Sequence, residues 1–399
     1  MYDVAVVGAG LAGAAMSLLL AKQGARVALI ERQTAEALAA EAADGRTTAI
    51  AAGARGLFDR LGVWNELEPD AGPILDIRVS DRDSILSLHF DHRAVGDEPM
   101  GHIVENFRLR RALLEAVQAE PTIAAYWGVQ LTGFETADGS AALVSDQEQV
   151  IEANLAIAAD GRGSTLRRLA GIGVRAIDYR QTAIVCTIHH ECPHDGIAHE
   201  RFLNGGPFAV LPMTNAPDGS HRSSIVWTEK RELAEYLLTL PRPSLERELR
   251  RRLGGFLGDI AIHGNCWSYP LSLTVTQRLT GRRLTLVGEA AHGIHPIAGQ
   301  GFNVSVRDIE TLGHSVGQAL AKGMDPGGRV LLNRYAQHRW PDILAMIAAT
   351  DGLNRLFLAD LPPFKLGRRL GLAAVDRIPP LKRQFQRHAM GLGLFGQAS

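Results

Sequence analysis

The chain has 399 residues with 42 basic and 43 acidic side chains, and its net charge of −1 excludes a general electrostatic attraction to nucleic acid. Hydrophobic residues make up 46% and charged residues 21%, the balance of a soluble globular protein long enough for two packed domains. The three cysteines lack CxxC spacing, so we expect neither a disulfide framework nor a bound metal. We expect a cytoplasmic protein, because neither a signal peptide nor an apolar run of ~20 residues is evident.

The opening of the chain predicts a strand–helix–strand unit. Residues 4–7 form a short apolar run typical of a strand buried on both faces, and the glycine-rich segment 8–13 follows it. Residues 14–23 have helical spacing, and residues 26–30 form a second strand that ends at Glu31. The unit therefore has the order expected of a parallel α/β domain.

Three glycines and one acid in this unit match a dinucleotide-binding fingerprint. Gly8 permits a tight turn, Gly10 lets the backbone approach a pyrophosphate, and Gly13 allows close packing of helix on strand. The helix N-terminus offers unpaired N–H groups to the phosphates. Glu31 can accept hydrogen bonds from ribose hydroxyls and disfavours a 2′-phosphate. Because all these features occur together, the pattern predicts dinucleotide binding rather than a structural turn.

The rest of the chain predicts an interrupted α/β domain. Short strands separated by Gly, Pro and Asn turns between residues 180 and 275 indicate an inserted antiparallel sheet. The elements expected are a helix at 104–117, strands at 155–159, 184–188, 208–211, 223–228 and 284–287, and a helix from 301 to about 322.

We therefore predict an α/β protein: a Rossmann-like domain with an inserted antiparallel-sheet substrate domain and a helical C-terminal tail. The tail from Leu361 to Ser399 holds seven basic residues and one acidic residue. The predicted ranges are 1–70, 100–175 and 276–350 for the Rossmann-like domain, 71–99 and 176–275 for the substrate domain, and 351–399 for the tail.

Three further motifs carry polar groups beside predicted strands. Residues 44–50, DGRTTAI, are equally compatible with a polar surface loop and with part of a site. Residues 160–164, DGRGS, are compatible with a capped turn or with a cofactor groove. In the segment 288–303, Glu289 could hold a polyol hydroxyl, and the Pro- and Gly-rich loop could lie against a planar ring. The helix beginning near Gly301 would then stabilise negative charge on that ring.

Together these motifs resemble the flavin-dependent aromatic hydroxylases of the para-hydroxybenzoate hydroxylase type. The sequence HPIAGQGFN at 295–303 is similar to that of the UbiH branch of the ubiquinone-biosynthesis hydroxylases. The overall resemblance extends from Asp3 to about Ala348. It implies noncovalent FAD, NAD(P)H or a reductase as electron donor, and O2 as co-substrate. In such enzymes oxygen adds at flavin C4a, and the resulting hydroperoxide hydroxylates an aromatic ring, here expected to be a polyprenyl phenol.

The resemblance also assigns residues to the cofactor. It places Glu31 at the adenosine ribose, Arg46 and Asn106 near the pyrophosphate and ribityl chain, and Glu289 at the ribityl chain. The family usually has Asp at this last position, so the extra methylene of Glu289 must be absorbed by a small shift. The full expected set is Gly8, Gly10, Leu11, Ala12, Gly13, Glu31, Arg32, Arg46, Asn106, Leu131, Asp160, Gly161, Gly288, Glu289, Pro296, Gly299, Gln300, Gly301, Phe302 and Asn303.

His295 and Pro296 are the expected catalytic residues. One of His292 and His295 could relay a proton near the flavin or the phenol. The alternative, which we favour for His295, is a loop residue whose ring hydrogen-bonds to the backbone. Phe208 and Trp227 could line a substrate pocket, although apolar residues on such a sheet more often belong to a core.

Other functions and locations stay open at this point. An FAD-dependent reductase or epoxidase of isoprenoids would share the first and last motifs, and a flavin-binding scaffold without turnover would share all of them. Apolar and basic residues alternate through 357–372, and Lys382-Arg383 follows. This pattern predicts peripheral association with the inner membrane or with a membrane-bound biosynthetic complex. The alternative is a tail packed on the protein's own core.

Overall fold

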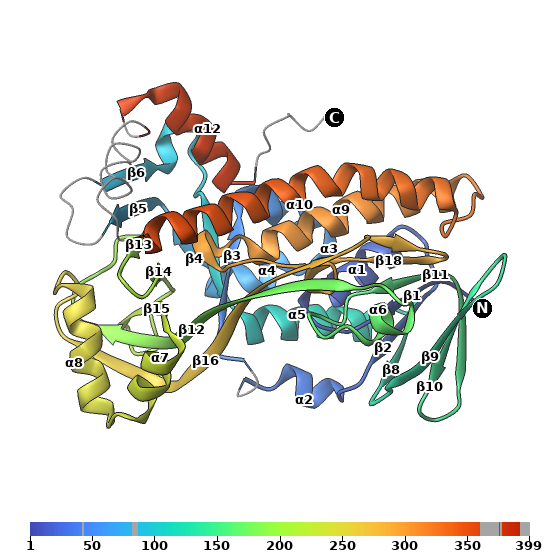
Figure 1. Cartoon of the computed structure of the whole chain (residues 1–399), viewed down its shortest axis with the longest axis horizontal. Coiled ribbons are helices and arrows are strands. Elements are labelled where there is room, and N and C mark those ends of the chain that lie inside the picture. The colour runs from blue at the N-terminus through green and yellow to red at the C-terminus, as the bar shows by residue number, and fades with distance from the viewer. Residues whose placement is uncertain (42–43, 82–86, 360–374, 376, 392–399) are drawn as a thin grey trace.

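A computed structural model describes residues 1–41, 44–81, 87–359, 375 and 377–391. Two eight-stranded sheets and a small three-stranded sheet organise this part of the chain (Figure 1). The first sheet lies at the end of the molecule that holds the N-terminus, and the second lies at the opposite end. The predicted α/β class, with a Rossmann-like unit and an added antiparallel sheet, is confirmed.

The first sheet has a parallel centre. All four residues of the predicted opening strand, 4–7, are apolar and buried, and all five residues of the neighbouring strand, 27–31, are buried, as expected for a parallel sheet covered on both faces. Val4 pairs with Val27 on one side and with Leu155 on the other. The parallel strands, in spatial order, are β18 (Leu284–Leu286), β11 (Val150–Ala158), β1 (Tyr2–Val7), β2 (Val27–Glu31) and β8 (Ile123–Trp127). The antiparallel additions are β17 (Thr280–Gly281), β9 (Leu131–Thr136) and β10 (Ala141–Ser145).

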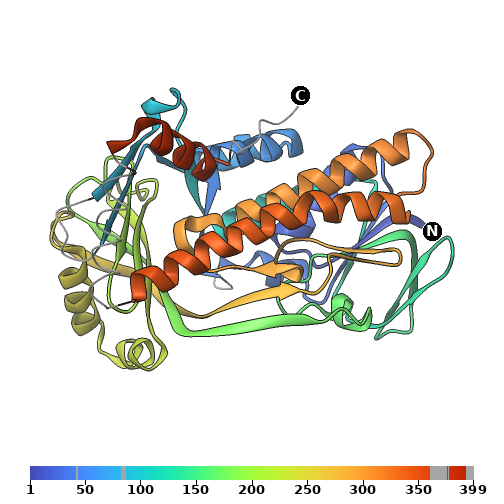
Figure 2. The same ribbon diagram turned by 45° about the horizontal axis from the view of Figure 1, so that its top comes forward.

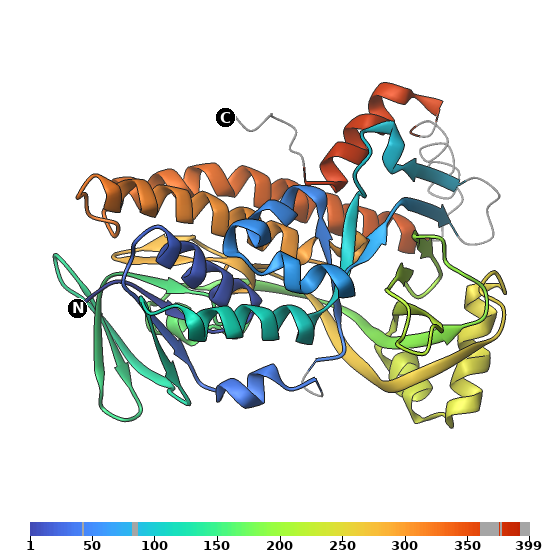
Figure 3. The same cartoon turned by 180° about the vertical axis from the view of Figure 1, so that it is seen from behind.

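Four long helices pack on or beside this sheet. Helix α1 (Leu11–Lys22) is apolar on almost every side because it lies between the sheet, α5 (Asn106–Ala119) and α9 (Gln300–Ala321). Figure 3 shows α1 and α5 on one face of the molecule, with α9 running beside the long helix α10 (Arg329–Leu358). Figure 2 shows α10 extending from the first sheet to the second, so that its C-terminal end reaches the inserted domain.

The second sheet contains the predicted inserted strands. Two strands of 17 residues each connect it to the first domain. One contains the strand predicted at 184–188 and is longer, and the other, at 260–276, was not predicted as a strand. In spatial order the strands are β19 (His292–Gly293), β16 (Ile260–Thr276), β12 (Val174–His190), β15 (His221–Lys230), β14 (Pro207–Pro212), β13 (Ile197–Phe202), β5 (Asp76–Asp81) and β6 (Ser87–Asp91). All neighbours are antiparallel except β13 and β5, which are parallel.

Helices α7 (Arg231–Thr239) and α8 (Arg242–Leu253) cover one face of this sheet. Phe208 and Trp227 are almost fully buried in the core between the sheet and these helices. They are therefore core residues and line neither of the cavities described below.

A three-stranded sheet joins the two large ones. Val104 pairs with Thr48 in this sheet, so the helix predicted from residue 104 begins only at Asn106. The β-branched Val104 favours a strand, and the pattern alone did not separate the two elements. The strands are β3 (Thr47–Ala51), β7 (Gly101–Glu105) and β4 (Gly72–Ile74). Shorter helices are α2 (Ala35–Ala39), α3 (Ala52–Leu61), α4 (Trp64–Leu67) and α6 (Thr165–Leu169).

The C-terminal tail includes helix α12 (Pro379–Ala389), while residues 360–374 lie outside the described part of the chain. Gln386 Nε2 donates to the carbonyl oxygen of Asp91 at 2.6 Å, and Gly53 N donates to the carbonyl oxygen of Met390 at 2.8 Å. The end of the chain thus packs against β6 and the start of α3. None of the described helices has the length and apolarity needed to cross a membrane.

Candidate functional site

Two cavities meet between the first sheet and the inserted sheet. One, of about 670 Å³, lies at the carboxyl ends of β1 and β2 and is lined by glycines and by both polar and apolar side chains; because it holds most of the charged groups, we name it the polar cavity. The other, of about 540 Å³, lies under the second sheet and is lined mainly by aliphatic side chains; we name it the apolar cavity. Both are lined by Thr47, Ala49, Pro296 and Gly299, which therefore mark their junction.

The glycine fingerprint forms one wall of the polar cavity. A Cβ on Gly13 would lie 1.8 Å from the carbonyl oxygen of Gly8, and a Cβ on Gly8 would lie 2.7 Å from that of Ala159. Both positions therefore need glycine for packing. A Cβ on Gly10 would have no neighbour within 4 Å and would stand in open space. Helix α1 begins just after Gly10 without a side-chain cap, so its first N–H groups are free to bind a ligand.

Glu31 is fixed at the end of β2. Its Oε2 accepts a hydrogen bond from Ala9 N at 2.7 Å, and its Oε1 accepts one from Gln33 N at 3.0 Å. The residue is nearly buried, yet it lines the polar cavity. Because each carboxylate oxygen can accept two hydrogen bonds, the carboxylate can still bind a hydroxyl. The same side chain thus holds the fingerprint loop and offers acceptors to a ligand.

Asp44 is the centre of a buried charge network. Arg46 and Arg110 each place a guanidinium nitrogen 2.8 Å from its carboxylate, and Asn106 Nδ2 donates to it at 3.1 Å. Burial alone would raise the pKa of Asp44, but the hydrogen bonds and charge of Arg46, with Asn106, lower it to about 2. Asp44 and Thr48 are both buried. The segment 44–48 is therefore a wall of the polar cavity and not a solvated surface loop.

The turn at 160–164 both caps a helix and lines the polar cavity. The Asp160 carboxylate accepts hydrogen bonds from Thr165 N at 2.6 Å and Leu166 N at 3.3 Å, at the start of α6. Arg162 extends to Glu289, with its Nη2 3.0 Å from Glu289 Oε1. Both interpretations of this motif thus describe part of its role. The longer side chain of Glu289 is held by an ion pair at the rim of the polar cavity.

A buried ion pair supports the loop before α9. His292 Nε2 lies 2.6 Å from Asp308 Oδ2, and Arg339 Nε lies 2.7 Å from Asp308 Oδ1. Asp308 also accepts a hydrogen bond from Gly288 N at 3.0 Å. Burial would raise the pKa of Asp308, but His292 and Arg339 keep it below its usual value. This network fixes the strand end at Gly288 relative to α9 and α10.

The N-terminus of α9 lies at the junction of the two cavities. Gly299 adopts a positive φ of 62° there, and the first turn has neither a side-chain cap nor an acidic residue. Asn303 Oδ1 accepts from Ala51 N at 3.0 Å, and its Nδ2 donates to the carbonyl oxygen of Ala49 at 2.9 Å. Asn303 thus ties α9 to β3 and faces the apolar cavity. The uncapped helix end gives the junction a positive electrostatic potential.

His295 lies on the wall of neither cavity. Its ring is 1% exposed and contacts Tyr179 edge to face, with 5.1 Å between ring centroids. Neither ring nitrogen has a hydrogen-bond partner among the described residues, so the favoured backbone hydrogen bond is absent there. Burial lowers the pKa of His295 to about 4. The buried His295 ring thus packs against Tyr179 in surroundings that disfavour a positive charge on it.

Most of the predicted cofactor-binding residues surround the polar cavity, but four do not. Gly13 and Gly288 serve packing, and Gln300 and Asn303 face the apolar cavity. Those that line the polar cavity are Gly8, Gly10, Leu11, Ala12, Glu31, Arg32, Arg46, Asn106, Leu131, Asp160, Gly161, Glu289, Pro296, Gly299, Gly301 and Phe302. Asp44 and Arg162, which belong to the motifs left open above, also line it, as do Arg110 and Arg168, which were missed. Arg110 could have been predicted, because it lies one helical turn after Asn106 and therefore on the same face of α5.

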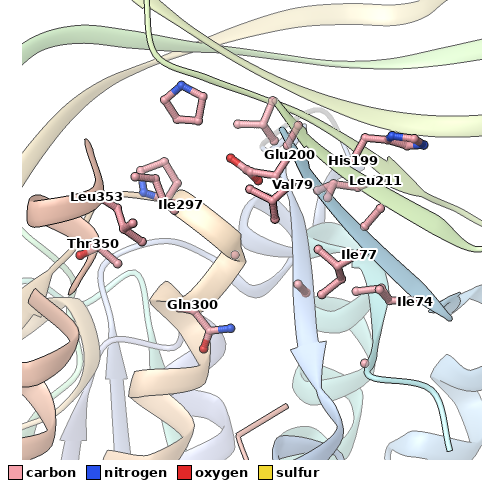
Figure 4. A pocket seen from close by; sticks show the side chains of 18 of the residues that line it. Ile74, Ile77, Val79, His199, Glu200, Leu211, Ile297, Gln300, Thr350 and Leu353 are labelled. Carbon is pink, nitrogen blue, oxygen red and sulfur yellow. The ribbon is translucent and has the colours of Figure 1, made fainter. Parts of the chain in front are cut away.

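The apolar cavity is bounded by β5, β13, β14, α9 and α10 (Figure 4). Its walls are formed by aliphatic residues such as Ile77, Val79, Leu211 and Leu353. Glu200 is the one acidic residue among its described lining residues, and burial raises the pKa of Glu200 to about 8. The cavity suits an apolar ligand with a small number of hydrogen-bonding groups.

The polar cavity fits a dinucleotide. The open space at Gly10, the uncapped start of α1 and the fixed acid Glu31 match the needs of a pyrophosphate and a ribose. The sequence profile of the FAD binding domain family matches residues 1–350. The chain belongs to this family. FAD is accordingly its cofactor, as the sequence predicted.

Curated relatives agree with this membership, and a solved structure agrees with the fold. The chain is 45% identical over 390 residues to the ubiquinone hydroxylase UbiL of Rhodospirillum rubrum, covering 98% of this chain and 89% of the relative. It is 31% identical over 392 residues to the 3-demethoxyubiquinol 3-hydroxylase of Escherichia coli, covering 98% of each. The fold is similar to p-nitrophenol 4-monooxygenase PnpA of Pseudomonas putida, with a TM-score of 0.79, 17% identity and coverage of 100% and 99%.

Proposed function

We propose that this chain is an FAD-dependent monooxygenase that hydroxylates the aromatic ring of a polyprenylated phenol in ubiquinone biosynthesis. The observation that carries the proposal is the junction at Pro296, where a dinucleotide cavity opens onto an apolar cavity of about 540 Å³. The names and full-length identity of the ubiquinone hydroxylases supply the substrate class. A substrate ring in the apolar cavity would lie beside the flavin ring held by the loop at Pro296.

The residues of the polar cavity would hold the cofactor. The N–H groups after Gly10 would bind the pyrophosphate, and Glu31 the adenosine ribose. Arg46, positioned by Asp44, would approach the phosphates and ribityl chain, and Glu289 would contact the ribityl chain. The loop 296–301 would support the flavin ring, with the helix end of α9 stabilising negative charge on it.

FAD, when bound and reduced by NAD(P)H or a reductase, supplies the capacity to place one atom of O2 on the ring and to release the other as water. The chain provides the environment. The aliphatic walls of the apolar cavity would exclude water, and a dry site limits the release of hydrogen peroxide without hydroxylation of the ring. Pro296, predicted as a catalytic residue, would act by holding the two rings at the junction. His295 would act by packing behind that loop.

The binding of cofactor and of substrate would be divided between the two predicted domains. Residues 71–99 and 176–275 would provide the substrate domain, and residues 1–70, 100–175 and 276–350 the cofactor domain. Strands β5, β13 and β14 of the former and helix α9 of the latter line the apolar cavity. The active centre would therefore form only where the two parts meet.

Because a polyprenylated substrate resides in lipid, the protein would bind peripherally to the cytoplasmic surface of a membrane. Exposed Leu353 and Leu356 on α10 also line the apolar cavity, and exposed Ile378 neighbours Arg377 at the start of the tail helix. Such residues could meet lipid while a polyprenyl chain enters. Sedimentation with anionic liposomes tests this idea, and a protein that stays in the supernatant at low salt would refute it. A direct contact with a membrane-bound complex would instead require pull-down of that complex.

The reaction itself is tested with purified protein, FAD, NADH, a short-chain prenylated phenol and ¹⁸O2. We expect one ¹⁸O atom in each product molecule, with oxygen consumed in proportion to product. A reductase or epoxidase of isoprenoids would leave the ring unlabelled. A flavin-binding scaffold would form no product with any electron donor. Either outcome would remove the proposed activity.

A further inference from the structure

Glu200 stands in the wall of the apolar cavity because of the alternation of strand β13. Successive side chains of a strand point to opposite faces, so Ala198, Glu200 and Phe202 share one face. All three line the apolar cavity. In the sheet, Glu200 pairs with Val79 on β5 and with Ala209 on β14, and both of these also line it. The carboxyl group is thus flanked by apolar neighbours.

The side chains of the residues next to Glu200 in sequence lie on the other face of the sheet, although His199 is also among the residues that line the apolar cavity. Arg201 Nη1 donates to the carbonyl oxygen of Leu253, beyond that face. The His199 ring packs against Phe256, with 4.4 Å between centroids. Figure 4 shows Glu200 directed into the cavity and His199 directed away from it. No ion pair or hydrogen bond joins the Glu200 side chain to another described residue. Within the part of the chain that the structure describes, the Glu200 carboxyl group therefore has no partner.

A lone carboxyl group in apolar surroundings is costly in its charged form. Burial raises the pKa of Glu200 to about 8, so the neutral acid predominates near pH 7. A neutral carboxyl group has one O–H donor and retains acceptor capacity. A ring hydroxyl has the same combination, so the two groups can form a reciprocal pair. A polar group that faces a cavity without a partner among the described residues is expected to find one in the ligand.

Resting on the proposed function, we propose that Glu200 binds a free ring hydroxyl of the substrate, orients the ring at the Pro296 junction, and selects such phenols over their methyl ethers. A methyl ether keeps an acceptor but loses the O–H group and adds a methyl in the same place. The carboxyl group then loses one of its two hydrogen bonds and meets a steric obstacle. Sites that hydrogen-bond a hydroxyl reject analogues lacking it, because their polar groups are left unpaired.

Thr228 is the competing polar group of the apolar cavity. Its Oγ1 is buried without a hydrogen-bond partner in the described parts of the chain, and it lies on β15 beside the same cavity. By contrast, Thr350 Oγ1 already donates to the carbonyl oxygen of Met346 at 2.9 Å. Thr228→Val keeps the shape of the side chain and removes only the hydroxyl, so it serves as the matched control for Glu200.

The test measures binding to the oxidised, FAD-loaded protein, separately from turnover. The probes are 2-prenylphenol and its methyl ether, and the flavin absorbance change gives each dissociation constant. We expect wild-type protein and Thr228→Val to bind the phenol about tenfold or more tightly than the ether. Glu200→Ala should bring this ratio close to one, and Glu200→Gln, which keeps a donor and an acceptor of similar shape, should give an intermediate ratio.

Several outcomes would overturn the proposal. If Glu200→Ala still prefers the phenol to the ether, or if Thr228→Val loses this preference, a residue other than Glu200 recognises the ring hydroxyl. Wild-type protein that binds both probes alike, or neither, would also end it. FAD content and melting temperature of each variant report folding, and Glu200→Gln covers the case in which the alanine variant is unstable. Absence of ¹⁸O in the product, with the binding ratio intact, would refute the proposed reaction and leave the role of Glu200 standing.

Discussion

The two cavities of this protein are built in different ways. The polar cavity is formed by short contiguous motifs at strand ends, and much of its binding capacity comes from backbone N–H groups and fixed carboxylates. The apolar cavity is formed by single side chains from strands far apart in the sequence, including β5, β13 and β14. Backbone binding demands glycine at fixed spacing, whereas an apolar wall accepts many residues of suitable size. The cofactor cavity is therefore visible in a sequence and the other is not.

The largest effect is expected for Gly10→Val, which should abolish FAD binding and leave the fold intact. The new side chain would occupy open space in the polar cavity, where a pyrophosphate must approach the backbone. Gly139→Val is the matched control, because a Cβ there also meets nothing within 4 Å but points to solvent in a turn between β9 and β10. Glu31→Ala should weaken binding less, by ~1.5–3 kcal/mol for each lost charge-assisted hydrogen bond.

The measurement is the chromophore released from purified protein on heating, identified by chromatography. We expect FAD from the wild type and from the Gly139 variant, and none from Gly10→Val. Wild-type affinity for FAD in Gly10→Val would show that the pyrophosphate does not lie against this turn. Release of FMN from the wild type would contradict the assignment of the polar cavity to a dinucleotide.

A smaller effect is expected for His295, which lies behind the junction of the two cavities. Its pKa is about 4 in the folded protein and 6.5 in the unfolded chain, because burial disfavours the charged ring. The unfolded state therefore binds more protons between these values, and stability falls as the pH drops from about 6.5 toward 4. His295→Asn should reduce this fall. His199→Asn offers a comparison, because burial also lowers the pKa of His199 to about 4, at the second sheet.

Thermal unfolding of the FAD-loaded protein between pH 7.5 and 5 measures both contributions. The melting temperature of the wild type should decline more steeply than that of either variant as the pH falls. If His295→Asn declines as steeply as the wild type, then His295 is not the neutral, buried group described above. A loss of turnover in His295→Asn at pH 7.5, with FAD content unchanged, would instead favour a proton relay.

The same contrast explains what could be predicted from the sequence. The fingerprint glycines, Glu31 and the loop at Pro296 have functions that depend on local spacing, and the sequence placed them beside one cavity. Asp44 belonged to a motif that was equally compatible with a surface loop, because its contact with Arg110, which is distant in sequence, exists only in the fold. Glu200 was missed because one acid in a strand usually faces solvent. The pattern of Ala198, Glu200 and Phe202 at alternate positions becomes informative only when that face is known to be covered.

We predict that a ring substrate occupies the apolar cavity beside a flavin held in the polar one. The most direct test is to titrate FAD-loaded protein with 2-prenylphenol while recording the flavin spectrum, in the wild type and in Ala209→Phe. Ala209 lines the apolar cavity next to Glu200, so phenylalanine would fill space there without touching the polar cavity. We predict equal FAD content, a saturable spectral change in the wild type, and at least an about tenfold weaker response in the variant. An unchanged response in Ala209→Phe would contradict the claim.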